Sequence, residues 1–137
     1  MTTTPSTDPV HVLSEDQCWE ALQSTDLGRL AIRAGHDIDV FPVNFLVTDR
    51  LIYFRTAPGT KMVELTRMPR VAFEADGVRA GRRWSVTLKG TAQRLGFDSE
   101  IEASGIQALR SLEPSSKWNY VRITPHSISG RRFEPAV

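Results

Sequence analysis

Residues 51–68 read LIYFRTAPGTKMVELTRM, and this stretch contains a change from strand to helix. Its first six residues are rich in aromatic and apolar side chains, as is typical of a strand. The residues Ala57-Pro58-Gly59 interrupt that strand, and the following segment has helical character until Pro69 stops it. We therefore predict a strand at 51–56 and a helix at 60–68, joined by a tight loop.

The loop collects side chains that suit a phosphate group. Arg55 and Lys61 supply positive charge, Thr56 and Thr60 supply hydroxyl donors, and Gly59 allows close approach of the backbone. A helix N-terminus adds free amides and a partial positive charge. The spacing is not that of a Walker A loop, which argues against nucleotide hydrolysis. An alternative stays open, in which Thr60 only caps the helix and Lys61 is solvated.

Further strands and helices are expected on both sides of this stretch. A capping box at Ser14–Gln17 predicts a short helix, and Asp98–Leu112 also has helical spacing. Pro42 must lie at an edge or a bulge, and Gly90 indicates a bulge or a sharp bend. The polar stretch 76–83 is expected to be a loop, and Pro125–Phe133 a turn with a short extension. Besides 51–56, strands are predicted at 27–34, 38–45, 71–75, 84–95 and 119–124.

These elements predict a mainly β protein with helices, of the α+β class, built as a six-stranded antiparallel split β-barrel. We expect residues 1–12 to be a flexible N-terminal tail and residues 13–137 to form a single domain. The length of 137 residues suits one such domain.

The composition excludes several classes of function. A formal net charge of +1 gives no general attraction to nucleic acid or to an anionic membrane. No apolar run is long enough to span a bilayer, and the first residues are polar. The single cysteine and three scattered histidines give no metal-site spacing. We expect a cytoplasmic protein without a metal, nucleic-acid partner or membrane partner.

Three segments together carry a family resemblance: Phe54–Leu65, Pro69–Phe73 and Trp84–Ala92. Their order resembles that of the pyridoxamine 5′-phosphate oxidase-like superfamily of flavin-binding split barrels, and the resemblance covers roughly Gly28–Phe133. It implies FMN as the cofactor, with a deazaflavin coenzyme as the main alternative and haem as a lesser one. It also implies that the loop described above, including Gly59, holds the coenzyme phosphate through Arg55, Thr56, Thr60 and Lys61. The usual oxidase pattern has Arg-Lys where this chain has Thr60-Lys61.

The resemblance assigns the rest of the coenzyme site as well. The strand with Phe41, Val43 and Asn44 is similar to the one that runs along the isoalloxazine ring, although a phenylalanine such as Phe41 is more often a core residue than a cofactor contact. Ser85 stands where the oxidases have a polar flavin contact. Arg131 lies in a segment similar to the one that reaches the flavin of the partner subunit. A homodimer is therefore expected, and a two-fold interface would also deepen a shallow groove.

These observations predict an oxidoreductase that moves hydride between its flavin or deazaflavin and a small organic substrate. Oxidation of pyridoxamine phosphate itself is not expected, because Arg131-Arg132-Phe133 departs from the tryptophan-containing pattern of that enzyme. The alternative is a non-catalytic protein that binds or stores flavin or haem. A haem protein would need an axial ligand, for which His36 and His126 are the candidates.

Overall fold

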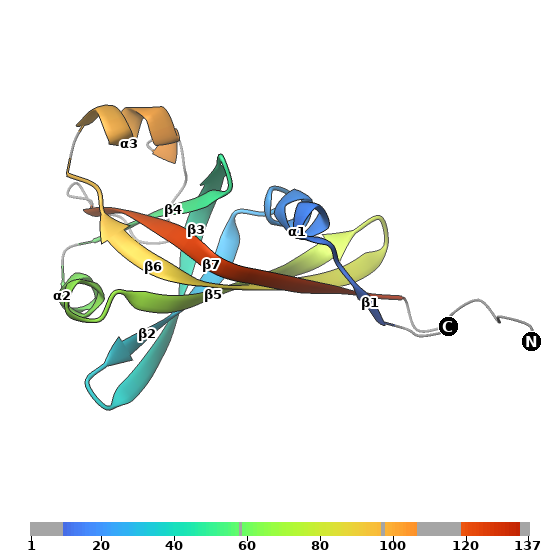
Figure 1. Cartoon of the computed structure of the whole chain (residues 1–137), viewed down its shortest axis with the longest axis horizontal. Helices are drawn as coiled ribbons and strands as arrows, with labels where there is room; N and C mark the ends of the chain where they lie inside the picture. The colour runs from blue at the N-terminus through green and yellow to red at the C-terminus, as the bar shows by residue number, and fades with distance from the viewer. Residues whose placement is uncertain (1–9, 58, 97, 107–118, 135–137) are drawn as a thin grey trace, which may run out of the picture.

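The computed structural model describes residues 10–57, 59–96, 98–106 and 119–134 of the chain. Seven strands and three helices follow one another along these residues (Figure 1). The strands form one antiparallel sheet in the order β1-β7-β4-β3-β2-β5-β6, and β6 also pairs with β7. In chain order the elements are β1 (Val10–Val12), α1 (Glu15–Leu22), β2 (Leu27–Ala34), β3 (Asp37–Thr48), β4 (Leu51–Thr56), α2 (Thr60–Arg67), β5 (Arg70–Arg79), β6 (Arg82–Arg94), α3 (Asp98–Ser104) and β7 (Asn119–Phe133).

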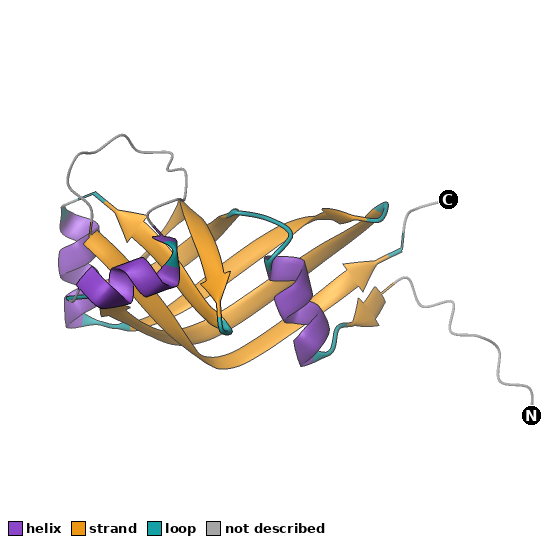
Figure 2. Cartoon of the chain, turned by 90° about the horizontal axis from the view of Figure 1, so that it is seen from above, coloured by secondary structure: helices purple, strands orange, loops and turns teal. Residues whose placement is uncertain are grey.

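The pairing of β6 with β7 makes β2 to β7 a closed ring of six strands. This is the six-strand antiparallel arrangement that the sequence predicts, and β1 adds a seventh strand along the end of β7. Figure 2 shows α2 and α3 gathered at one end of the sheet, whereas α1 lies apart from them. Helix α1 packs against β5, β6 and β7.

The core lies inside the ring and is made by alternate residues of each strand. In β2 the buried positions include Leu30 and Ile32, and in β6 they include Val86 and Leu88. Phe45 and Phe73 meet edge to face, with ring centroids 4.8 Å apart. A second, smaller core of Tyr53, Leu95 and Ile106 lies under α3. The period-two burial explains why the sequence predicts the strands well.

Several predicted elements are confirmed closely. Strand β2 occupies the predicted residues 27–34, and β4 occupies 51–56. The capping box of α1 is present. The backbone N–H of Gln17 donates to Ser14 Oγ (3.2 Å), and the backbone N–H of Ser14 donates to Gln17 Oε1 (2.8 Å). Helix α3 starts at Asp98 as expected and ends at Ser104. The rest of the helix predicted to residue 112 lies partly outside the described residues.

Three expectations about loops and ends are wrong. The stretch 76–83 is not a loop, because β5 and β6 pair through Arg79↔Arg82 and leave a tight turn. That turn needs the positive φ of Ala80 (53°) and Gly81 (76°). The segment 125–133 is no turn either, since β7 continues through it to Phe133. Residues 10–12, expected to belong to the flexible tail, form β1.

The bulge predicted at Gly90 is present. Lys89 pairs with Ser127 but Gly90 pairs with Pro125, so His126 is the extra residue on β7. A Cβ atom on Gly90 would lie 2.4 Å from the carbonyl oxygen of Thr124. Only glycine allows the two backbones to come this close. The bulge also explains how Pro125, which has no amide, is accommodated within a long strand.

Candidate functional site

The predicted phosphate corner is formed where β4 ends and α2 begins. Arg55 and Thr56 are the last residues of β4, and they pair with Tyr120 and Asn119 of β7. Thr56 is buried, and its hydroxyl donates to the carbonyl oxygen of Ala57 (3.4 Å). The strand pairing therefore fixes Arg55 and Thr56 at the end of β4, next to the loop.

Gly59 is the N-cap of α2, so the helix starts with a residue that has no side chain. No side-chain hydrogen bond caps this helix among the described residues. The alternative in which Thr60 acts as the cap is therefore wrong, because Thr60 is already the first helical residue. Apart from its chain neighbours, no described residue has an atom within 4 Å of where a Cβ of Gly59 would be. An uncapped helix start with open space beside it is suited to bind an anion through its backbone amides.

Lys61 connects this corner to β3. Its Nζ lies 4.2 Å from the centroid of the Phe41 ring, a cation–π contact. Phe41 and Val43 are both buried and belong to the main core. Two of the predicted site residues, Phe41 and Lys61, which are 20 residues apart in the sequence, are thus brought together. Phe41 serves both as a core residue and as the neighbour of the ammonium group.

Beside this corner β3 has an open edge. Strand β4 pairs with β3 only from Phe45 to Thr48, whereas β2 pairs with residues 37–44. Phe45 donates its amide to the carbonyl oxygen of Asp26 (2.9 Å), toward the β2 side. Because this direction alternates along a strand, the backbone groups of Asn44 and Pro42 point to the opposite, open edge. Pro42 therefore lies at an edge, as the sequence predicts.

The Asn44 side chain is only partly satisfied. Its Nδ2 donates to the carbonyl oxygen of Asp26 (3.2 Å). Its Oδ1 is buried and has no hydrogen-bond partner among the described residues. A buried amide oxygen without a donor is unusual in a folded protein. A further hydrogen-bond donor would satisfy this oxygen.

Ser85 and Arg131 lie elsewhere. They are direct partners across β6 and β7, so the structure does bring these two predicted residues together. However, Arg55 pairs with Tyr120 near the start of β7, whereas Arg131 is near its end. At about 3.3 Å per residue, the two groups are on the order of 30 Å apart along the strand. Within one chain the predicted site residues therefore form two separate groups.

The histidines that a haem site would need are not in the corner. His36 is exposed in the turn between β2 and β3. His126 occupies the bulge of β7, where its Nε2 lies 2.6 Å from the Thr91 hydroxyl. The part of the chain that the structure describes contains no cluster of three or more His, Cys, Asp or Glu that could hold a metal ion. Nor do its helices include one long and apolar enough to cross a membrane.

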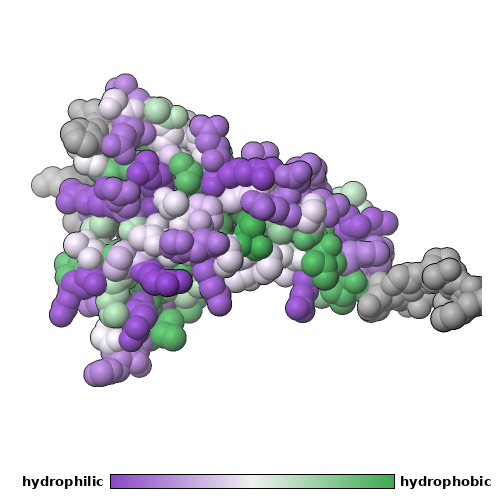
Figure 3. Space-filling view, in the orientation of Figure 1, coloured by the Kyte–Doolittle hydropathy of each residue, from purple (hydrophilic) through white to green (hydrophobic). Residues whose placement is uncertain are grey.

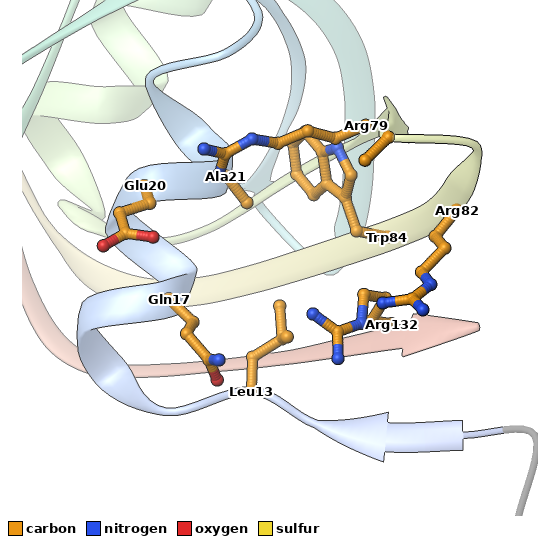
Figure 4. A pocket seen from close by; sticks show the side chains of 9 residues that line it. Leu13, Gln17, Glu20, Ala21, Arg79, Arg82, Trp84 and Arg132 are labelled. Atoms are coloured by element: carbon orange, nitrogen blue, oxygen red, sulfur yellow. The ribbon is translucent and has the colours of Figure 1, made fainter. Parts of the chain in front are cut away.

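The sequence analysis missed one group of functional candidates. Arg79, Arg82 and Arg132 line a cavity of about 300 Å³ beside α1, together with Trp84 (Figure 4). These arginines come from the β5–β6 turn and from the end of β7. The pair Arg131-Arg132 is visible in the sequence, but nothing in the sequence indicates that Arg132 faces the β5–β6 turn.

Known proteins resemble this chain over nearly its whole length. A profile of the family described as pyridoxamine 5′-phosphate oxidase matches residues 14–132. A Corynebacterium glutamicum structure described as "Putative pyridoxamine 5'-phosphate oxidase" is 40% identical, with a TM-score of 0.85, over 97% of this chain and 99% of that one. An FAD binding protein from Mycobacterium smegmatis is 33% identical, with a TM-score of 0.76, over 92% of this chain and 100% of that one.

Two other similarities complete the comparison. An uncharacterized protein of Mycobacterium tuberculosis is 35% identical over 88 residues, which are 64% of this chain and 80% of that protein. A heme binding protein from Mycobacterium smegmatis shares the fold at 16% identity, with a TM-score of 0.66, over 81% of this chain and 50% of that one. The fold therefore has both flavin-binding and haem-binding members. Because the family profile spans the ring of strands and the β4–α2 corner, the chain belongs to the pyridoxamine 5′-phosphate oxidase-like family.

Proposed function

We propose that this protein binds a flavin nucleotide at the β4–α2 corner and uses it to transfer hydride to or from a small organic substrate. The observation that carries this proposal is the position of Lys61, whose Nζ lies 4.2 Å from the Phe41 ring centroid. This contact places a cation beside both the uncapped start of α2 and the open edge of β3. A coenzyme with a phosphate and a flat ring requires these two features side by side.

The residues of the corner fit the phosphate. Arg55 and Lys61 offer positive charge, and the first turn of α2 offers backbone amides behind Gly59. Charge-assisted hydrogen bonds of this kind are the stronger ones in proteins. Thr56 and Thr60 are the hydroxyl residues of the same corner. These groups would bind the phosphate and fix one end of the coenzyme.

The open edge of β3 fits the ring. Asn44 offers a backbone amide and carbonyl there, and Pro42 offers a carbonyl without a competing amide. The unpartnered Oδ1 of Asn44 is an additional acceptor. A bound flavin supplies the hydride and electron transfer, so the chain needs no catalytic dyad of its own. Its residues would hold the ring edge, orient one face and exclude water.

We propose a flavin nucleotide, FAD or FMN, as the coenzyme. The Mycobacterium smegmatis relative at 33% identity is an FAD binding protein, which supports a flavin over the deazaflavin coenzyme. The heme binding neighbour shares only 16% identity, and haem has no histidine in the corner among the described residues. The proposed substrate is a small organic molecule. Which molecule fits depends on the side chains that a second copy of the chain would contribute to the site.

That second copy is the proposed partner, in a homodimer. Ser85 and Arg131 lie too far along β7 to reach the corner of their own chain, but a two-fold copy could present them. Apolar side chains near the open edge support such contact: Ile38 is 69% exposed, Val40 65% and Val63 55%. Figure 3 shows apolar groups among hydrophilic ones where the β2–β3 hairpin lies. Exposed large apolar side chains near a binding groove are consistent with an interface.

Coenzyme binding is tested by titrating the protein, freed of bound coenzyme, with FAD, FMN and the deazaflavin coenzyme. We expect a Kd well below about 1 μM for a flavin, equivalent to more than about 8 kcal/mol of binding free energy. Lys61→Gln should weaken binding by about 10- to 100-fold, because it removes one charge-assisted hydrogen bond. Arg67→Gln, at the other end of α2, is the matched control and should bind as the unchanged protein does.

Four results would argue against these proposals, each against a different part. Micromolar or weaker binding of both flavins would exclude the flavin site, and tighter binding of the deazaflavin coenzyme would change its identity. Light scattering that reports only monomer at micromolar concentration would exclude the shared site. Catalysis is measured by anaerobic oxidation of the reduced holoprotein with a quinone or a nitroarene. If the holoprotein reduces the quinone or nitroarene no faster than the free reduced coenzyme does, the protein binds or stores the coenzyme without catalysing the reaction.

A further inference from the structure

The cavity beside α1 has two chemically different walls. It measures about 300 Å³, at the lower end of the range for small-molecule sites. Leu13, Ala21 and Trp84 form an apolar wall, and Arg79, Arg82 and Arg132 form a cationic one. In Figure 4, Arg82 and Arg132 lie near Leu13, and Arg79 extends past Trp84 toward Ala21 of α1. The combination suits a ligand with an apolar body and an acidic group.

The cationic wall has more charge than its neighbours neutralise. Arg82 Nε pairs with Glu134 Oε2 at 3.1 Å. Arg79 and Arg132 make no ion pair with the described residues. Glu20, an acidic residue that lines the cavity, makes no ion pair with Arg79, Arg82 or Arg132. The Nε of Arg132 is buried and has no hydrogen-bond partner among the described residues. Several guanidinium groups around one cavity repel one another unless an anion joins them.

The cavity is distinct from the proposed flavin site. Neighbouring residues of a strand face opposite sides of the sheet. Ser85 and Arg131 are partners on one side, so Trp84 and Arg132, the adjacent pair, face the other. Trp84 is buried toward α1, whereas Arg131 is exposed. A ligand at Arg132 therefore does not compete with a coenzyme that reaches Arg131.

We propose that this cavity is a second binding site, for a small anion with an apolar body, such as an aromatic carboxylate or an aromatic phosphate ester. The anionic group would accept hydrogen bonds from the arginines, which offer the planar donor geometry that carboxylate and phosphate oxygens match. The apolar body would lie against Leu13 and the Trp84 indole. The bound anion would bridge the α1 region and the β5–β6 turn through its single negatively charged group.

The proposal is tested with the full chain by isothermal titration calorimetry. Benzoate and phenyl phosphate are the anionic probes, and benzyl alcohol is the neutral probe of similar size. We expect at least one anion to bind with a Kd below about 1 mM and benzyl alcohol to bind at least about tenfold more weakly. The stronger of the two anions identifies the acidic group that the site prefers. No heat with either anion, or equal affinity for benzyl alcohol, would overturn the proposal.

Variants locate the site. Arg132→Gln and, separately, Arg79→Gln should each raise the Kd for the anion by about tenfold, the loss expected for one charged hydrogen bond. Arg79 is exposed at the turn, so its variant is not expected to affect folding. Arg83→Gln is the matched control, because Arg83 is next to Arg82 but does not line the cavity. Unchanged affinity in both test variants, or equal loss in the control, would show that the anion binds elsewhere. Flavin affinity measured in parallel should not change in Arg79→Gln, which keeps the two sites distinguishable.

Discussion

Replacement of Gly90 by alanine tests the close approach of β6 and β7 at the bulge. The added Cβ would lie 2.4 Å from the Thr124 carbonyl oxygen and 2.9 Å from Ile123 Cγ2. An ordinary carbon–oxygen contact is about 3.3 Å or longer, so β6 and β7 must separate locally by nearly 1 Å. Neither strand can move freely, because β6 is also held by β5 and β7 by β4.

The size of the effect follows from this displacement. Overpacking costs about 1–3 kcal/mol, and weakening one or two ladder hydrogen bonds costs about 1 kcal/mol each. We therefore expect Gly90→Ala to lower the free energy of unfolding by about 3 kcal/mol and the Tm by about 10 °C. Urea unfolding followed by far-UV circular dichroism, at one fixed protein concentration, measures the change.

A second glycine provides the control for this experiment. Apart from its chain neighbours, no described residue has an atom within 4 Å of a Cβ placed on Gly96. Gly96→Ala should therefore leave stability within about 0.5 kcal/mol of the original or raise it slightly, by restricting the unfolded chain. If Gly90→Ala were as stable as Gly96→Ala, the bulge would not need a glycine and the register around Pro125 would have to be revised.

Three other changes should have measurable effects. Ser14→Ala removes the capping-box acceptor of α1 and should cost about 1 kcal/mol, measured by urea unfolding, and an unchanged midpoint would contradict the role of the cap. Phe73→Ala removes a fully buried ring that packs on Phe45 and should cost about 3–5 kcal/mol, so a loss below 1 kcal/mol would show that the ring is not core. Burial, together with the negative charge of Asp76, raises the pKa of Glu74, so its proton favours the folded state. The stabilisation by this proton is complete below the ordinary glutamate pKa of about 4.3 and is lost as the pH rises through the raised pKa of Glu74. Glu74→Gln removes this titration, so the variant should lose less Tm than the original protein as the pH rises across this window. Identical Tm-against-pH profiles for the two proteins would refute the role of Glu74.

The sequence predicts the strands whose two faces differ. In β2 alternate residues are buried, and its predicted bounds are those observed. The β5–β6 hairpin lacks this signal near its turn, because Arg79, Arg82 and Arg83 are all exposed and the residues resemble a loop. The second half of β7 is not predicted, because a proline such as Pro125 normally ends a strand. Here the bulge accommodates it. Pairing with β6 and β1, not local preference, holds that segment extended.

The candidate site was predictable in part for a similar reason. The corner is local, since Arg55 to Lys61 lie within one short stretch, and the sequence order alone brings them together. The contact of Lys61 with Phe41 depends on how α2 packs, and only the structure reveals it. The arginine-lined cavity requires three segments that are far apart in the sequence. Charges that converge only through tertiary packing leave no pattern in a single sequence.

The open edge of β3 also affects how the isolated chain avoids aggregation. An unpaired strand edge with exposed Ile38 and Val40 is a template on which a strand from another molecule could add, as in a growing fibril. Pro42 lies in the middle of that edge and has no amide to donate, so a continuous ladder cannot form across it. The same proline that leaves the edge available to a small ligand therefore acts as a gatekeeper against uncontrolled strand addition.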